Sequence, residues 1–154
     1  GVRVHALIAG CPPLDSNSMY CNLLQCSHFA DTCVLAENEG DIAAFLSAYR
    51  KPHDPEVMFI WQIAVAAKYR GLGLASRMLD ALMRRSTANH VSYIETSITP
   101  SNQASANLFE RFAQKQAATL TKSVLFSKAE HFGGQHDDEV LFRIGPLQMQ
   151  NPSQ

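Results

Sequence analysis

Hydrophobic residues recur along the chain with periods that alternate between those of strands and those of helices. Short apolar or alternating runs predict strands at residues 32–36, 42–49, 57–65, 91–99, 119–126 and 139–144. Apolar positions at helical spacing predict helices at residues 2–10, 18–28, 72–86 and 102–116. Glycine, proline and polar residues predict turns or loops at residues 37–40, 51–55 and 130–138. Asp15, Ser16 and Asn17 are the expected caps of the second helix. This order predicts an α/β fold with a mixed sheet.

The chain has 154 residues, which suits one domain, expected over residues 1–146 with a polar, frayed tail at 147–154. Hydrophobic residues make up 46% and charged residues 18%, as in ordinary globular proteins. The net charge of −1 and the lack of a basic stripe argue against a nucleic-acid partner. No apolar run approaches the ~20 residues of a membrane span, so no membrane partner is expected.

Cysteine and histidine residues are the chain's first candidates for metal ligands. Cys11, Cys21, Cys26 and Cys33 have spacings that match no paired ligand pattern, so they are expected to be free thiols in a reducing cytoplasm. The loop containing His131 and His136 with its acids at 137–139 offers ligand types, but its spacing fits no regular site. No metal is predicted.

The most informative segment is the glycine-rich turn between the strand at 57–65 and the following helix. Gly71 and Gly73 allow a ligand to approach the backbone closely, and the first helix amides form a seat for phosphate. The turn lacks the Gly-Lys-Ser/Thr of a P-loop, and Ser76 stands where a dinucleotide fingerprint has its third glycine.

Arg70-x-x-Gly73-x-Ala75 instead resembles the pyrophosphate signature of the GCN5-related N-acetyltransferases (GNAT), which use acyl-CoA. The resemblance implies the GNAT fold over nearly the whole chain, without the strand that normally precedes the first helix. We expect that strand to be lost by truncation. It also implies acetyl-CoA as co-substrate. The cofactor-binding residues implied by the family are Ile63, Val65, Arg70, Gly71, Leu72, Gly73, Leu74, Ala75 and Asn102.

Residues 11–26, 99–105, 136–139 and 143–146 also resemble signatures of the L-2,4-diaminobutyrate acetyltransferases. That resemblance implies direct acetyl transfer to the γ-amine of diaminobutyrate in ectoine biosynthesis, under osmotic stress, by a cytoplasmic homodimer. It implies substrate-binding residues at Asp15, Tyr20, Trp61, His136 and Glu139. Of these, Asp15, Trp61 and Glu139 are the expected catalytic residues, and Glu95 is a further candidate acid.

Each of these residues also has an ordinary structural explanation. Asp15 could cap a helix, Tyr20 could lie on a helix surface, and Trp61 could belong to the core. Residues 136–139 could form a solvated loop. Phe109 stands where many GNAT enzymes have a tyrosine that protonates the leaving thiolate, which leaves the general acid open. An acetyltransferase for another amine, or a non-catalytic acyl-CoA sensor, therefore remains an alternative.

Overall fold

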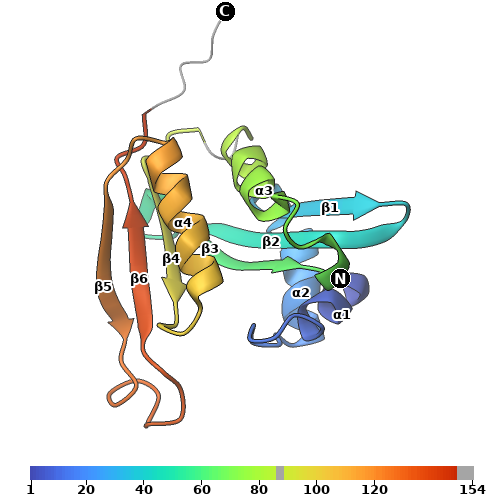
Figure 1. Ribbon diagram of the computed structural model, residues 1–154, viewed down its shortest axis with the longest axis horizontal. Coiled ribbons are helices and arrows are strands. Elements are labelled where there is room, and N and C mark those ends of the chain that lie inside the picture. Colours follow the sequence, from blue (N-terminus) through green and yellow to red (C-terminus); the bar gives the residue numbers. More distant parts are fainter. Residues whose placement is uncertain (86–88, 149–154) are drawn as a thin grey trace, which may run out of the picture. The chain divides into compact units, whose positions relative to one another are not determined.

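The computed structural model describes residues 1–85 and 89–148 (Figure 1). Its helices are α1 (Val2–Ala9), α2 (Met19–Ser27), α3 (Leu74–Met83) and α4 (Gln103–Lys115), with short 3-10 helices η1 (Ala30–Thr32) and η2 (Ala67–Tyr69). Its strands are β1 (Val34–Asn38), β2 (Asp41–Lys51), β3 (Asp54–Val65), β4 (Tyr93–Ile98), β5 (Leu120–Phe126) and β6 (Glu139–Ile144). Within the described residues the strands form one sheet in the order β1-β2-β3-β4-β6-β5.

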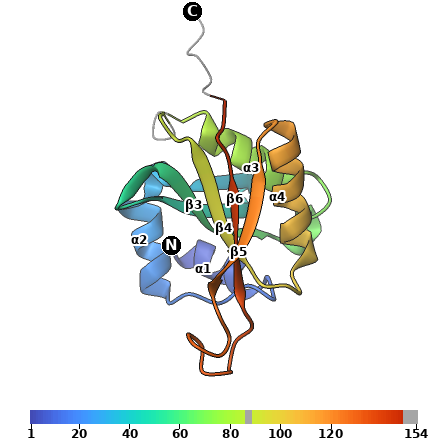
Figure 2. The same ribbon diagram turned by 90° about the vertical axis from the view of Figure 1, so that its left-hand side faces the viewer.

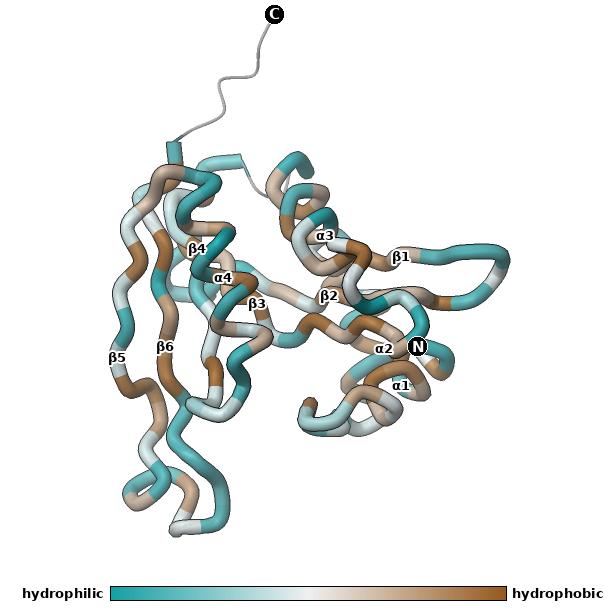
Figure 3. The backbone as a smooth tube through the Cα atoms, in the orientation of Figure 1, coloured by the Kyte–Doolittle hydropathy of each residue, from teal (hydrophilic) through white to brown (hydrophobic). Residues whose placement is uncertain are grey.

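The predicted elements are confirmed, but several of their ends were wrong. β1 continues to Asn38 because its turn to β2 needs only Glu39 and Gly40, both at positive φ. That turn is strongly hydrophilic (Figure 3). The loop predicted at 51–55 is also shorter, since β3 already begins at Asp54. Leu72 lies before α3 rather than in it, and Ser86, the predicted helix end, lies outside the described residues.

The cap of α4 is the expected residue, whereas the cap of α2 is not. Asn102 caps α4, its side-chain oxygen accepting the Ser105 N–H at 3.2 Å. The cap of α2 is Ser18, whose hydroxyl accepts the Cys21 N–H at 3.1 Å. The prediction that residues 15–17 cap this helix was therefore wrong. Ser18 has the same capping chemistry and lies directly before the first helical residue.

The chain divides into two compact units. Unit 1 comprises Gly1–Arg50 and Ile60–Asn89, and unit 2 comprises Lys51–Phe59 and the residues from His90 onward. In unit 1, α1 lies beside α2, and α3 lies against β1. A cluster of buried side chains joins α1 to the strands. Its members are Val4, Ile8, Cys11, Cys33, Phe45 and Ala64.

In unit 2, side chains alternate between the two faces of the antiparallel strands β4, β6 and β5. One face is apolar and carries buried Ile94, Phe142 and Ile144. Helix α4 covers this face (Figure 2), and Lys122 of β5 reaches Glu110 of α4 at 2.8 Å while lying over the Phe142 ring. The opposite face carries Glu95, Ser97, Glu139 and Arg143 beside Leu141 and is the more polar of the two.

The segment after β6 is anchored where the polar tail was predicted to begin. Leu147, the first residue of the predicted polar tail, is buried, and its N–H donates to the Ser92 carbonyl at 2.8 Å. The frayed tail therefore does not begin there, because an apolar side chain anchors the segment. Residues 149–154 of that predicted tail lie outside the described residues.

Across the described part of the chain, no helix has the length and apolar character to cross a bilayer.

Replacing Ile8 by alanine tests the core of unit 1. Ile8 is 1% exposed, so Ile8→Ala should lower the free energy of unfolding by about 2–4 kcal/mol through lost burial and a cavity. Val2→Ala on the same helix is the matched control, because Val2 is 60% exposed and should cost less than about 0.5 kcal/mol. Urea unfolding would measure both. Equal losses in the two variants would contradict this core.

Candidate active site

The turn from β3 to α3 has the geometry of a phosphate seat. Gly71 and Gly73 have φ values of 75° and 71°, a region that suits glycine. A Cβ at either position would meet no atom within 4 Å, so the backbone faces open space. The first bond within α3 runs from the Arg77 N–H to the Gly73 carbonyl. Helix geometry leaves the preceding amides, from Leu74 onward, available to an anion at the positive end of the helix dipole.

Arg70 is held at this turn by the backbone. Its Nε donates to the Val65 carbonyl at 3.1 Å, and the Cys11 thiol donates to the same oxygen at 3.4 Å. A guanidinium has five N–H donors, so this bond orients the side chain and uses only one of them. The exposed Arg70 therefore lies at the start of the glycine turn as a cation suited to a pyrophosphate.

In unit 1, Trp61 is not an ordinary core residue. Its side chain is 44% exposed and meets Tyr49 edge to face, with ring centroids 6.2 Å apart. An exposed, oriented indole can serve as a wall for an aliphatic substrate stem.

The loop that carries Asp15 is anchored to the next residue of β3. Gln62 donates to the Asp15 carbonyl at 2.8 Å and accepts from Asn17 at 2.8 Å. Asp15 is exposed and is not the cap of α2. Because neighbours on a strand point to opposite faces, Gln62 fixes the loop backbone without directing the Asp15 carboxylate at Trp61. Sequence reasoning missed Gln62, since a single glutamine in an apolar strand belongs to no motif.

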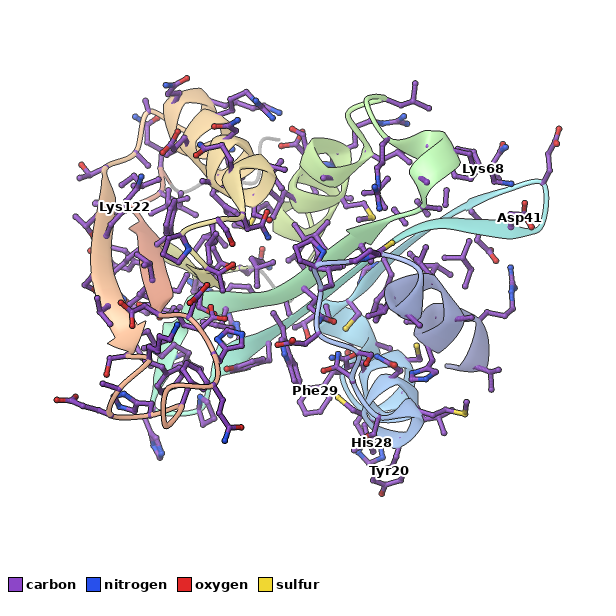
Figure 4. All side chains as sticks on the ribbon, turned by 60° about the horizontal axis from the view of Figure 1, so that its bottom comes forward. Tyr20, His28, Phe29, Asp41, Lys68 and Lys122 are labelled. Atoms are coloured by element: carbon purple, nitrogen blue, oxygen red, sulfur yellow. The ribbon has the colours of Figure 1, made fainter. Side chains whose placement is uncertain are left out.

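Tyr20 lies in the first turn of α2 and is 69% exposed. Figure 4 shows it projecting outward from that helix, as Phe29 and His28 also do near its other end. Its position is that of a surface helix residue, so its role as a substrate donor stays a prediction.

In unit 2, His136 and Glu139 lie close together, and their role at a shared substrate site stays a prediction. His136 Nδ1 is 2.7 Å from the Asp137 carbonyl, and a carbonyl can only accept, so Nδ1 carries the hydrogen. The other ring nitrogen, Nε2, lies 3.8 Å from Glu139 Oε1. In the neutral form of His136 both of these atoms are proton acceptors. The pair is thus suited to an ammonium or amine placed against both.

The remaining polar residues of this loop hold its shape. His131 Nδ1 accepts the Ser127 N–H at 3.0 Å, and Asp138 accepts the Lys128 N–H at 2.6 Å. Lys128 also pairs with Asp137 at 3.1 Å. These contacts use the side chains that a metal would need, and no group of three His, Cys, Asp or Glu residues is arranged as a metal site anywhere in the described ranges.

Glu95 is the buried acid of unit 2, and both its oxygens are engaged. Lys51 donates to Oε2 at 2.8 Å, and Arg143 donates to Oε1. Burial raises the pKa of Glu95, but the hydrogen bonds and charges of Lys51 and Arg143 outweigh burial and hold the pKa below its ordinary value. This environment argues against Glu95 as a base. Sequence reasoning found Glu95 but missed its two partners, which are distant in sequence.

Two further predicted positions have a structural role. Phe109 is 3% exposed and belongs to the buried face of α4. Asn102 is the α4 cap, and its contact with CoA stays a prediction. Among the thiols, burial raises the pKa of Cys33 to about 11, so this cysteine stays protonated and is a poor nucleophile.

Comparison with known proteins assigns the family. The sequence model described as "Acetyltransferase (GNAT) family" matches residues 4–113. The chain belongs to the GNAT acetyltransferase family. This assignment confirms the GNAT fold and an enzyme that uses acetyl-CoA as co-substrate.

Individual proteins similar to this chain have a more specific activity in their names than the family model gives. The chain is 49% identical over 147 residues to L-2,4-diaminobutyric acid acetyltransferase of Methylotuvimicrobium alcaliphilum, covering 96% of this chain and 86% of the relative. It is 47% identical over 144 residues to the enzyme of that name from Vibrio parahaemolyticus, covering 94% and 80%. It also resembles the structure of diaminobutyrate acetyltransferase EctA from Paenibacillus lautus in complex with L-2,4-diaminobutyric acid and coenzyme A. The TM-score is 0.91 and the identity 42%, over 99% of this chain and 92% of that one.

Gly73→Ala should weaken CoA binding about tenfold, because the added Cβ enters the open space in front of the α3 amides and the left-handed φ becomes strained. Gly40→Ala in the β1–β2 turn is the matched control, since Gly40 also has a positive φ and open space around its Cβ position. Calorimetric titration with CoA would measure both. Equal affinities in the two folded variants would contradict the phosphate seat.

Glu95→Gln should destabilise unit 2 by about 3 kcal/mol at neutral pH, because two cations lose their buried partner. A carboxylate with a lowered folded-state pKa stabilises the fold above its unfolded pKa of about 4.3, and this contribution is lost as the pH falls through the lower folded value. Urea unfolding from pH 7 to pH 3 should show the difference from wild type shrinking with acid. Glu110→Gln, which removes an exposed pair, is the control and should cost less than about 1 kcal/mol. A difference that is independent of pH would contradict this role.

Proposed function

We propose that the protein transfers the acetyl group of acetyl-CoA to the γ-amine of L-2,4-diaminobutyrate. The observation that carries the proposal is the 42% identity, over 99% of this chain, to an enzyme whose structure holds diaminobutyric acid and coenzyme A. The product, Nγ-acetyl-diaminobutyrate, belongs to ectoine biosynthesis and the response to osmotic stress. A cytoplasmic homodimer is part of the proposal, and the free cysteines support a reducing compartment.

CoA would be held by unit 1 through its pyrophosphate. Arg70 supplies charge, and the backbone from Gly71 to Ala75 supplies amides and close approach. The amides of Ile63 and Val65 at the end of β3 would polarise the thioester carbonyl as its oxygen gains charge. Asn102 at the start of α4 would add a polar contact.

By family resemblance, Asp15, Tyr20 and Trp61 are candidate substrate-binding residues in unit 1, and His136 and Glu139 are candidates in unit 2. An ammonium has no lone pair, so the γ-amine must lose a proton before it attacks. The two acceptors in unit 2, 3.8 Å apart, support the role of Glu139 as the group that takes it, with His136 as its partner. Trp61 would orient the carbon stem, and Asp15 would bind a second charged amine.

The reaction then proceeds by direct attack in a ternary complex. The neutral amine, having given one proton to Glu139, forms a bond to the thioester carbon, and the carbon–sulfur bond breaks. The second proton, shed by the nitrogen as the amide forms, passes to water. CoA leaves as a thiolate, because a thiol with an ordinary pKa of about 8.5 needs no strong acid near neutral pH. Phe109 at the usual tyrosine position is compatible with that departure. The buried, protonated Cys33 supports a route without an acetyl-cysteine.

Release of the CoA thiol with diaminobutyrate, ornithine, lysine and 1,3-diaminopropane tests the substrate. Preference for diaminobutyrate with an Nγ-acetyl product by NMR would support the proposal. Faster turnover of another amine would retain the fold and CoA site but replace the substrate. Tight CoA binding without turnover of any amine would favour a sensor.

Glu139→Gln should lower kcat by about 10²–10⁴-fold while leaving CoA affinity unchanged, because the amide cannot accept the amine proton. Glu130→Gln is the matched control, since Glu130 is an exposed acid of the same loop whose backbone N–H bonds to Ser127. Steady-state kinetics and CoA titration would measure both variants. Full turnover by Glu139→Gln would contradict its role as the proton acceptor.

A further inference from the structure

The polar face of unit 2 carries a second charged cluster besides His136 and Glu139. Lys51, Glu95 and Arg143 come from β2, β4 and β6, and Glu95 lies directly opposite Arg143 in the strand pairing. The Arg143 guanidinium also lies 3.9 Å from the centre of the Tyr93 ring. We refer to Lys51, Glu95 and Arg143 as the cation cluster.

The cation cluster has one positive charge in excess, because two cations share one carboxylate. Glu95 is nearly inaccessible, with 3% of its side chain exposed, whereas Lys51 and Arg143 are 40% and 33% exposed. Ammonium and guanidinium groups have three and five donors. The cluster therefore combines a buried anion that fixes two cations with N–H groups that reach solvent.

Stabilisation of the fold alone does not account for this arrangement. A buried ion pair seldom stabilises a protein more than apolar side chains of the same volume would. The opposite face of the same strands is packed with apolar side chains instead, where Ile94, Phe142 and Ile144 lie under α4. The charged cluster thus points to an anionic ligand.

The position of the cluster relates it to the proposed substrate. Glu139 and Arg143 lie on the same face of β6, four residues or about 13 Å apart along the strand. Lys51 and Arg143 are held by Glu95, and their remaining donors are available to a ligand that lies along this face. In diaminobutyrate the γ-nitrogen and the carboxylate are separated by three carbons, so a molecule with its amine at Glu139 can direct its carboxylate toward the cluster.

We infer that Lys51 and Arg143, oriented by Glu95, bind the α-carboxylate of the amino-acid substrate and select it against simple diamines. The inference rests on the proposed function. Lys51 and Arg143 are then specificity-determining residues, and Glu95 is a positioning residue that holds both.

The test compares diaminobutyrate with 1,3-diaminopropane, which has a similar amine but no carboxylate. Lys51→Met and Arg143→Lys should each raise KM for diaminobutyrate about tenfold with kcat within about threefold. The arginine variant keeps the charge but loses the planar fork that matches a carboxylate. Neither variant should raise KM for 1,3-diaminopropane, and Lys51→Met should lower it, because a repelling cation has been removed.

Lys122→Met is the matched control, because Lys122 also pairs with a glutamate at 2.8 Å but lies on the apolar face, over the Phe142 ring. It should leave both KM values unchanged, and CoA affinity should report that every variant is folded. Equal losses on both amines, or an unchanged KM for diaminobutyrate in both folded variants, would overturn the inference. A wild-type enzyme that does not prefer diaminobutyrate to 1,3-diaminopropane would instead overturn the proposed function.

Discussion

The alternation of side chains along a strand is the constraint on which this structure depends. In unit 2 it gives β4 and β6 one face that packs under α4 and one that carries charge. The two faces are linked, because strands that carry Glu95 and Arg143 on one side carry the buried Ile94 and Ile144 on the other. The same rule in β3 separates Trp61, an exposed aromatic wall, from Gln62, which anchors a loop.

The left-handed backbone at Gly71 and Gly73 makes the phosphate seat possible in unit 1. A chain leaving β3 must turn sharply to begin α3, and these two residues absorb that change without a Cβ penalty. Arg70 is then aligned by the final carbonyl of the same strand. The end of β3, the glycine turn and the start of α3 thus form one continuous segment. Residues close in sequence supply both its charge and its amides.

This local character explains what the sequence could predict. The glycine turn and the strands and helices depend on neighbours in the sequence, and the structure has them as expected. The cap at Ser18 and the ends of β1 were misplaced because several adjacent residues have equivalent capping or turn chemistry. The contacts of Gln62 and of Glu95 join residues more than 40 positions apart, and one sequence contains no signal for them.

The anchoring of Arg70 has a consequence for how the protein tolerates change. Its acceptor is a main-chain oxygen at Val65, and every amino acid at that position would provide the same atom. The loop with Asp15 depends instead on the amide side chain of Gln62, which most substitutions would remove. Substitutions at Val65 should therefore preserve the backbone contact that orients Arg70 for coenzyme A. Substitutions of Gln62 should instead change the loop that is proposed to bind the amine. A scaffold built in this way can acquire new acceptors without losing its acyl donor.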